Sequence, residues 1–421
     1  MRRSSTARVT TFIAVSLALA ACGGPTAGQP PIAPGAARVE LGGQERVLYS
    51  FTGQGDGGDP AADLVFDASG SLVGTTVVGG TAGCGTVFAL TPGVKGSWKE
   101  TARYSFDCYS TGKNPYGGVL FNGSTTAYGT TVSGGSGPSC GSSGCGVAYE
   151  LSGSSESVLH DFAAGSDGFG PGDALAADAN GDLFGMTPDG GKDSAGVVYE
   201  LTKRGNAWSE RVIHAFTGGK DGGTGSLGRL TIDDTGIYGV AETGGAYGAG
   251  TVFRMTYARG TGWRFTTLYA FKGVPDCASP YGGLVKDSHG NIYGTTYSGG
   301  TDGLGCIFEL NASHAKSERV LHNFEGGSDG SRPTGTLFQT GVELYGTTSM
   351  GGGSCDCGTV FALDTQTRHV RILHSFHGAS DGAYPYYGVT PDSSGNLYGT
   401  TAAGGTANRG TVFEIRRPAR R

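Results

Sequence analysis

Short apolar segments that end in phenylalanine recur along the chain at nearly constant spacing. Val-Ile-His-Ala-Phe at 212–216 and Val-Leu-His-Asn-Phe at 320–324 are two examples. The closing residues are Phe51, Phe106, Phe162, Phe216, Phe271, Phe324 and Phe376, which lie 52 to 56 residues apart. A fixed period of this length is typical of repeat architectures. The pattern therefore predicts seven copies of one structural unit.

Each unit contains four short segments with the character of strands. After the Phe come a Gly/Asp/Pro loop, a segment of the type Gly-Gly-Leu-Val, a turn, a segment reading Leu-Tyr-Gly-Thr-Thr, and a segment reading Gly-Thr-Val-Phe. Apolar residues at every second position, bounded by turn residues, predict strands. Four strands in about 50 residues fit one blade of a β-propeller. The first strand is rich in small residues, so we expect it to lie innermost and the Phe strand outermost.

The two ends of the chain carry complementary parts of one unit. The last repeat stops after its third strand, at residues 410–415, and the first repeat opens with a lone Phe strand at residues 45–51. Pairing these strands removes two exposed edges. We therefore expect an all-β fold over residues 45–415, a seven-bladed β-propeller of four-stranded blades closed by the N-terminal strand. An open solenoid, which tolerates the same fragments, remains the alternative.

Composition narrows the class of protein. There are 81 glycines among 421 residues, but they do not recur at every third position, which excludes collagen. The formal net charge of −6 argues against a nucleic-acid partner, which would be met by a basic surface.

The N-terminus predicts export. Arginines precede an apolar run at residues 12–21, which is too short to span a bilayer. The end of this run, Leu-Ala-Ala-Cys at 19–22, resembles the lipobox of bacterial lipoproteins, in which the cysteine is acylated. Residues 1–21 are then a lipoprotein signal peptide, Cys22 carries the lipid, residues 22–44 form a Gly/Pro/Ala-rich tether, and residues 416–421 form an Arg-rich tail. We expect attachment to the membrane through this lipid, in the outer membrane or at the cell surface. An ordinary signal peptide with an incidental cysteine is the alternative.

Eight further cysteines fit an oxidising compartment. Cys84 and Cys108 lie at strand ends that antiparallel pairing brings together, and Cys277 and Cys306 fall on one face of a single unit. Cys140 and Cys145 share one loop, and Cys355 and Cys357 are one residue apart. We expect four disulfides, although sequence alone does not fix the pairing. A Cys-x-Cys metal clip is the alternative at residues 355–357.

Several of these segments together point to a family. Ser-Asp-Gly-Ala-Tyr-Pro at 380–385, Asp-Ser-Ser-Gly-Asn-Leu-Tyr-Gly-Thr-Thr at 392–401 and Gly-Thr-Val-Phe at 410–413 resemble the GloVer-type extracellular tandem repeat. The resemblance extends over residues 45–415. It implies an exported bacterial repeat protein with a surface anchor, and it implies no established activity.

Repeated polar residues offer candidate binding sites. Loops that enter the inner strands carry acidic turns at Asp56, Asp167, Asp221, Asp329 and Asp381. Carboxylates around one channel mouth would suit a cation such as Ca²⁺, or a basic or polyhydroxylated ligand. Asp-Gly pairs also form turns for purely structural reasons, and we favour that interpretation. Histidines at four Leu-His-x-Phe positions belong to different blades, so we predict no metal site and no cofactor.

Residues that break the sevenfold pattern are the weak catalytic candidates: Asp189, Asp193, Glu242 and Asp302. Tyr116, Tyr281 and Tyr384, beside prolines on the same face, suit stacking on sugars or contact with a protein. We interpret the chain as a monomeric, non-catalytic binding or structural module at the cell surface, with a glycan or a protein as its ligand. A polysaccharide-acting hydrolase or lyase using carboxylates of that face is the first alternative, and an envelope scaffold without a ligand is the second.

Overall fold

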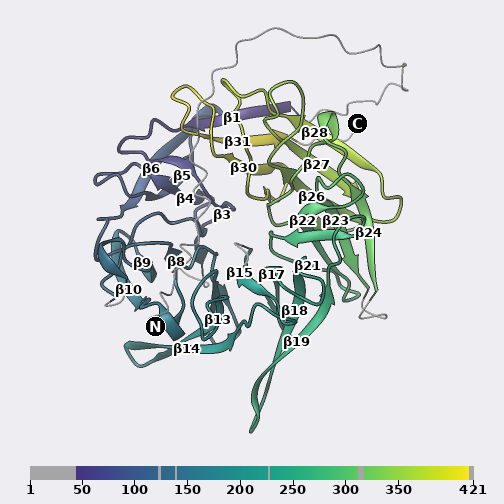
Figure 1. The fold of residues 1–421 in the computed structure, drawn as a ribbon. Helices are drawn as coiled ribbons and strands as arrows, with labels where there is room; N and C mark the ends of the chain where they lie inside the picture. The colour runs from purple at the N-terminus through teal and green to yellow at the C-terminus, as the bar shows by residue number, and fades with distance from the viewer. Residues whose placement is uncertain (1–43, 122–124, 138–139, 226–227, 312–316, 417–421) are drawn as a thin grey trace, which may run out of the picture. The chain divides into compact units, whose positions relative to one another are not determined.

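Seven small antiparallel sheets form a ring in the computed structural model (Figure 1). The structure describes residues 44–121, 125–137, 140–225, 228–311 and 317–416. Every sheet has four strands along its path from axis to rim, and in three blades an additional short strand pairs with the second strand. The prediction of an all-β, seven-bladed β-propeller is confirmed.

The strands are given blade by blade, from the axis outward. Blade 1 holds β2 (Gly58–Pro60), β3 (Val65–Phe66), β4 (Leu72–Val78), β5 (Thr86–Pro92) and β6 (Trp98–Ser105). Blade 2 holds β7 (Leu120–Phe121), β8 (Thr126–Thr131), β9 (Val147–Ser152) and β10 (Ser155–Asp161). Blade 3 holds β11 (Ala176–Ala177), β12 (Leu183–Thr187), β13 (Val197–Arg204) and β14 (Ala207–Ala215). Blade 4 holds β15 (Gly223–Gly225), β16 (Thr231–Asp233), β17 (Gly236–Thr243), β18 (Thr251–Ala258) and β19 (Gly262–Ala270).

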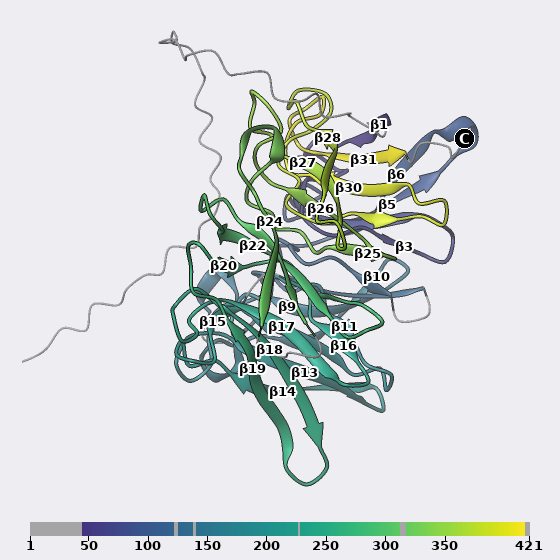
Figure 2. The same ribbon diagram turned by 90° about the vertical axis from the view of Figure 1, so that its right-hand side faces the viewer.

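The remaining blades follow the same plan. Blade 5 holds β20 (Cys277–Pro280), β21 (Val285–Lys286), β22 (Ile292–Gly299), β23 (Cys306–Leu310) and β24 (Glu318–Asn323). Blade 6 holds β25 (Phe338–Thr340), β26 (Glu343–Thr348), β27 (Thr359–Asp364) and β28 (Val370–Ser375). Blade 7 holds β29 (Thr390–Pro391), β30 (Leu397–Thr401), β31 (Thr411–Arg416) and β1 (Gln44–Ser50). Short 3₁₀ turns lie at Val94–Gly96, Gly141–Ser143, Gly165–Asp167 and Gly327–Asp329. Both views show the β18–β19 hairpin extending beyond its neighbours (Figures 1 and 2).

The repeated phenylalanines hold adjacent blades together. All seven are fully buried. Each packs edge-on against the aromatic ring of the third strand in the next blade, with ring centroids 5.0–5.6 Å apart: Phe51–Phe88, Phe106–Tyr149, Phe162–Tyr199, Phe216–Phe253, Phe271–Phe308, Phe324–Phe361 and Phe376–Phe413. Edge-to-face geometry is favourable for aromatic pairs.

This packing explains the glycine of the Tyr-Gly-Thr-Thr strand. A Cβ atom on Gly74 would lie 2.8 Å from the ring of Phe88, and one on Gly399 would lie 2.4 Å from the ring of Phe413. The third-strand aromatic ring therefore occupies the space where a side chain would stand. The glycine of the Gly-Thr-Thr motif and the aromatic residue of the Gly-Thr-Val-Phe motif therefore contact each other within the blade.

Threonines of the second strands tie five of the blades to the inner segment of the next one. The hydroxyls donate to backbone carbonyl oxygens in five pairs: Thr75–Gly117 (3.2 Å), Thr130–Asp173 (2.7 Å), Thr295–Gly335 (3.3 Å), Thr347–Tyr387 (2.8 Å) and Thr400–Ala62 (3.3 Å). The last of these crosses from blade 7 to blade 1.

The ring closes in the way that the incomplete first and last repeats predicted. Strand β1 pairs antiparallel with β31, and Tyr49 lies opposite Val412. Near the axis, Gly388 N donates a hydrogen bond of 2.7 Å to Asp63 Oδ1. These contacts rule out the open solenoid.

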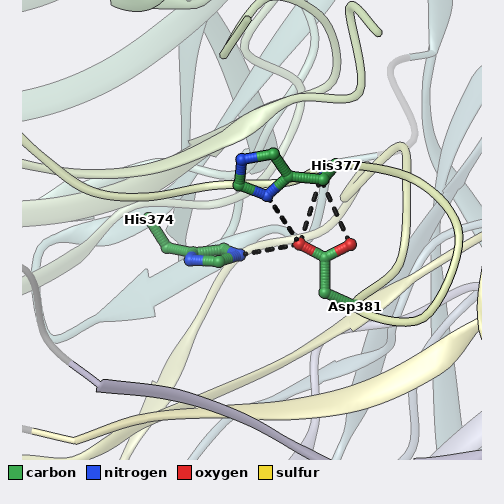
Figure 3. A group of neighbouring side chains, drawn as sticks. All are labelled: His374, His377 and Asp381. Atoms are coloured by element: carbon green, nitrogen blue, oxygen red, sulfur yellow. Dashed lines mark hydrogen bonds and ion pairs between the residues drawn. The ribbon is translucent and has the colours of Figure 1, made fainter.

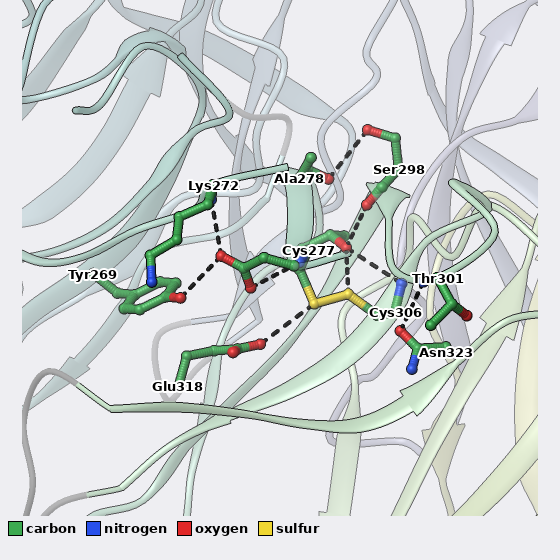
Figure 4. The surroundings of a disulfide bond; sticks show 11 residues. Tyr269, Lys272, Cys277, Ala278, Ser298, Thr301, Cys306, Glu318 and Asn323 are labelled. Carbon is green, nitrogen blue, oxygen red and sulfur yellow. Dashed lines mark hydrogen bonds between the residues drawn. A yellow bond between two sulfur atoms is a disulfide. The ribbon is translucent and has the colours of Figure 1, made fainter. Parts of the chain in front are cut away.

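All eight cysteines of the propeller form disulfides: Cys84–Cys108, Cys140–Cys145, Cys277–Cys306 and Cys355–Cys357. The expectation of four bridges is confirmed, and the Cys-x-Cys pair is not a thiolate clip. Figure 4 shows the Cys277–Cys306 bridge beside Tyr269 and Glu318, joining the start of β20 to the start of β23. The predicted signal peptide, Cys22 and the predicted tail beyond Arg416 lie outside the described residues, so lipid attachment stays a prediction. Among the described residues, no helix has the length and apolar character needed to cross a bilayer.

Candidate functional site on the axial face

The five acidic turn residues named in the sequence analysis bind the rim strand that precedes them. Each follows the buried Phe by five residues and contacts a His or Tyr two residues before that Phe. The pairs are His160–Asp167 (3.0 Å), His214–Asp221 (3.2 Å), His322–Asp329 (2.9 Å), His374–Asp381 (3.3 Å) and Tyr49–Asp56 (2.9 Å), and Tyr269–Asp276 (2.9 Å) repeats the arrangement. The same carboxylates also accept backbone N–H groups of the turn, as Asp329 does from Glu325 N at 3.0 Å.

These contacts give each turn a structural task. The carboxylate joins the end of one blade's rim strand to the loop that enters the next blade. A Ca²⁺ ion or another ligand at these turns would have to displace these hydrogen bonds.

At five of the turns between blades, a glutamate from the following blade interacts electrostatically with an aspartate of the turn. It stands six residues before the next buried Phe, at Glu45, Glu100, Glu156, Glu210 and Glu318, and we call these residues the seam glutamates. Burial, with a neighbouring aspartate adding to it, raises the pKa to about 7 for the first four and to about 8 for Glu318. In the first four, Oε1 is buried without a hydrogen-bond partner. Sequence analysis missed them, although a Glu at one fixed position in five repeats was a readable signal.

The inner segments next to the axis are built from small residues, as predicted. Ala62, Gly117, Gly282 and Gly335 occupy equivalent positions, where backbones of adjacent blades touch: a Cβ on Gly117 would lie 2.4 Å from the carbonyl oxygen of Asp173. Asp173 in blade 3 and Tyr387 in blade 7 stand at this position and break the pattern.

Asp173 is the most unusual of these residues. Its side chain is buried, since only 3 % of the residue is exposed, and neither carboxyl oxygen has a hydrogen-bond partner. Burial raises the pKa of Asp173 well above its usual range. A buried polar group without a partner is costly, so this carboxyl is a candidate for contact with a ligand. Sequence analysis missed it because the inner strand was interpreted only as a run of small residues.

Tyrosines from different blades gather around this carboxyl. Burial raises the pKa of Tyr387, and the nearby Tyr281, Tyr116, Asp63 and Asp173 add to that shift. Tyr281 shows the same direction of pKa shift, with burial as the main cause. Electrostatic coupling between residues of blades 1, 2, 3, 5 and 7 places these groups close to one another around the axis.

A second layer of aromatic rings surrounds this centre. Tyr384 stacks on Tyr386 with ring centroids 6.3 Å apart, and Tyr281 lies 6.4 Å from Tyr297. The guanidinium of Arg332 sits 4.8 Å from the centroid of the Tyr297 ring. We call Tyr116, Tyr281, Tyr297, Tyr384, Tyr386 and Tyr387 the axial tyrosines. The three tyrosines named from the sequence all belong to this group.

The four weak catalytic candidates are not brought together. Glu242 is close enough to Tyr281 to raise the pKa of that tyrosine, and burial raises the pKa of Glu242 itself. Burial also raises the pKa of Asp189, which lies in the loop after β12. Asp193 and Asp302 are exposed. Among the four candidates, Glu242 therefore interacts electrostatically with an axial tyrosine, Tyr281.

Comparison with known proteins identifies the repeat. The sequence model of the Gloeobacter/Verrucomicrobia repeat matches residues 135–354 and 227–420, which together make up more than half of the chain. The chain belongs to the Gloeobacter/Verrucomicrobia repeat family. This family membership confirms the GloVer resemblance seen in the motifs. No curated protein sequence matches this member of the family.

Solved structures share the fold at low sequence identity. An oligogalacturonate lyase from Vibrio parahaemolyticus has a TM-score of 0.51 and 10 % identity, with 86 % of this chain and 90 % of that chain covered. A putative 6-phosphogluconolactonase from Bacteroides uniformis has a TM-score of 0.46 and 14 % identity, covering 78 % and 87 %. A puromycin hydrolase has a TM-score of 0.47 and 13 % identity. The match covers 79 % of this chain but only 48 % of the hydrolase chain. At such identities the likeness concerns the fold alone.

Proposed function

We propose that this protein is a non-catalytic binding module that takes a glycan at the axial tyrosines. The observation that carries the proposal is the electrostatic coupling of Tyr387 to tyrosines of blades 2 and 5 and to Asp173, a buried carboxyl that has no hydrogen-bond partner among the described residues. Ring contacts of 6.3 and 6.4 Å extend this group from Tyr281 to Tyr297 and from Tyr384 to Tyr386.

The chemistry of the face suits a polyhydroxylated ligand. Flat aromatic rings pack against the C–H faces of sugars, and tyrosine hydroxyls supply hydrogen bonds at the ring edge. A raised pKa favours the protonated form of Asp173, which both donates and accepts a hydrogen bond, as a sugar hydroxyl requires. Burial likewise raises the pKa of Glu242. These groups favour a neutral glycan over a strongly charged one.

Lipid attachment belongs to the same proposal. We propose that Cys22 anchors the propeller in the cell envelope, in the outer membrane or at the cell surface, and that the protein acts there as a monomer. A Cys22→Ser variant should then appear in the soluble fraction while the wild-type protein stays with membranes. Equal membrane retention of both would contradict the anchor.

A polysaccharide-acting hydrolase or lyase is the second candidate. Asp173 and Glu242 both have raised pKa values, as a general acid in such an enzyme would. An oligogalacturonate lyase shares the propeller fold, although fold alone does not assign an activity.

Binding and turnover can be measured on the same samples. The wild-type chain, Tyr281→Ala and Asp173→Asn are screened against neutral and acidic oligosaccharides by calorimetry, and products are followed by chromatography. We expect binding without products, and affinity reduced at least about 10-fold by either change. Tyr109→Ala is the matched control, because Tyr109 is 74 % exposed in a loop after a rim strand. Product formation that Asp173→Asn abolishes would favour the enzyme, and a wild-type protein that binds no glycan would favour a scaffold.

A further inference from the structure

The rim turn between blades 6 and 7 carries an imidazole that the other turns lack. His374 and Asp381 form the His–Asp pair found in three other turns, and His377 adds a second ring in the spacing His-x₂-His-x₃-Asp. The equivalent positions in the other turns hold Thr52, Asp107, Ala163, Thr217, Lys272 and Glu325. In the turns at Thr52 and Thr217, a threonine hydroxyl, not a ring nitrogen, contacts the aspartate.

Both rings point their nitrogens at the same carboxylate oxygen (Figure 3). His374 Nε2 lies 3.3 Å and His377 Nδ1 lies 3.1 Å from Asp381 Oδ2, which also accepts the His377 backbone N–H at 3.0 Å. Ligand atoms of the three side chains all lie within 4.8 Å of one another. In tetrahedral zinc sites with bonds of 2.0–2.1 Å, two ligand atoms are about 3.3 Å apart. The two nitrogen–oxygen distances match this spacing, and the two ring nitrogens lie within 4.8 Å of each other, so an ion would replace the two hydrogen bonds with a small adjustment of the rings.

The closing strand offers a candidate for a fourth ligand, Glu45, which lies outside the group of ligand atoms within 4.8 Å of one another. Glu45 of β1 is coupled electrostatically to both Asp381 and His377. Its Oε1 is buried and has no hydrogen-bond partner. If the Glu45 side chain turned toward the three ligand atoms, its carboxylate would complete a set of two nitrogens and two oxygens.

We propose that His374, His377, Asp381 and Glu45 bind a divalent transition-metal ion of the Zn²⁺ type. Imidazole nitrogen suits zinc and its neighbours in the first transition series, whereas Ca²⁺ and Mg²⁺ prefer oxygen ligands alone. His374 lies on the rim strand of blade 6 and Glu45 on the rim strand of blade 7, so the ion would clamp the seam beside the ring closure. The site is separate from the axial tyrosines and does not depend on the proposed glycan.

Two other groups of ligand-type side chains occur in the described part of the chain, and both are weaker. His160, Asp167 and Glu210 offer a single imidazole. In the group of Asp276, Cys277 and Glu318, the sulfur is bonded to Cys306 and is not a thiolate. The turn of the first group has Ala163 at the position that His377 occupies in the turn after blade 6. The same turn therefore forms without the second imidazole ring.

Zinc binding to the purified full-length chain tests the proposal. Metal is removed with a chelator, zinc sulfate is titrated by calorimetry, and Co²⁺ is used as a spectroscopic probe of tetrahedral coordination. We expect one Zn²⁺ per chain and a melting temperature that rises with zinc. His377→Ala should weaken binding by at least about 100-fold, since a lost ligand costs more than a lost neighbour of a ligand.

The controls separate this site from unspecific binding. His377 has a side chain that is 78 % exposed, so His377→Ala should leave the fold intact. His322→Ala removes a ring from the matching turn between blades 5 and 6, and zinc affinity should not change. Glu45→Gln should weaken binding by about 10-fold or more. Absence of stoichiometric zinc in the wild-type protein, or equal affinity of wild type and His377→Ala, would overturn the proposal.

Discussion

Removing the carboxyl of Asp173 should make the protein more stable. The side chain is buried and makes no hydrogen bond, and blade 1 has Ala62 at the equivalent position. A protonated carboxyl left without partners costs about 1–3 kcal/mol, and Asp173→Ala removes that cost while losing some packing. At pH 4 we expect Asp173→Ala to be more stable by about 1 kcal/mol.

The gain should grow with pH. The pKa of Asp173 is raised in the folded state, so the folded protein holds this proton more tightly than the unfolded chain does. In the wild-type protein, the stabilisation from proton binding at Asp173 is fully present below the pKa that this group has in the unfolded chain. It is lost as pH rises toward the higher pKa of the folded state. Each pH unit in that window adds up to about 1.4 kcal/mol to the advantage of the variant. The advantage of Asp173→Ala should therefore be larger at pH 7 than at pH 4.

Thermal unfolding at pH 4, 5.5 and 7 measures this difference. At about 2.1 cal/mol/K per residue, a folded domain of this size has an unfolding entropy of about 0.8 kcal/mol/K, so each 1 kcal/mol corresponds to about 1.3 °C. Asp63→Ala is the matched control, because Asp63 Oδ1 accepts a hydrogen bond from Gly388 N, which the change would leave unsatisfied. That variant should be less stable by about 1–3 kcal/mol. A melting temperature of Asp173→Ala below that of wild type, or a difference that does not grow with pH, would refute the reasoning.

Three further changes have clear expected results in thermal or denaturant unfolding. Burial raises the pKa of Glu100 and Glu156 from 4.5 to about 7, so the free energy of unfolding falls as pH rises from about 4.5 to about 7. Gln at both positions should flatten this dependence by about 1 kcal/mol, because both groups are half exposed; an unchanged slope would contradict the assignment. Thr400→Val should cost about 1 kcal/mol because it removes a hydrogen bond between blades 7 and 1, and a neutral result would argue that this bond is not needed for closure. Replacing Cys84 and Cys108, which are 24 residues apart, with Ala should cost about 3 kcal/mol through loop entropy; equal melting of wild type and variant would count against it.

The sequence was sufficient to predict the architecture. Seven phenylalanines at one spacing predicted seven blades, and each of them packs against the next blade. The incomplete first and last units predicted the pairing of β1 with β31. The phenylalanines recur at one spacing and the two terminal units complement each other, so both features can be recognised in the sequence without any knowledge of three-dimensional distances.

The candidate site was harder to predict because its contacts cross between blades. Asp381 was noticed as an acidic turn, but its contact with His374 depends on how the loop folds back over the rim strand. Glu45 is separated from Asp381 by almost the whole chain and meets it only because the ring closes. Asp173 required alignment of the inner segments, where one acid stands among alanines and glycines.

Closure by the first strand also constrains how the protein is made. Strand β1 is synthesised before any blade is complete, and its partner β31 is synthesised last. The hydrogen bond from Thr400 to Ala62 joins residues 338 positions apart. Contacts between residues so far apart in the sequence form slowly. The edge of β1 therefore stays unpaired, and open to aggregation, until β31 has been synthesised. A chain that stops before residue 411 lacks β31, so its first strand would keep an unpaired edge.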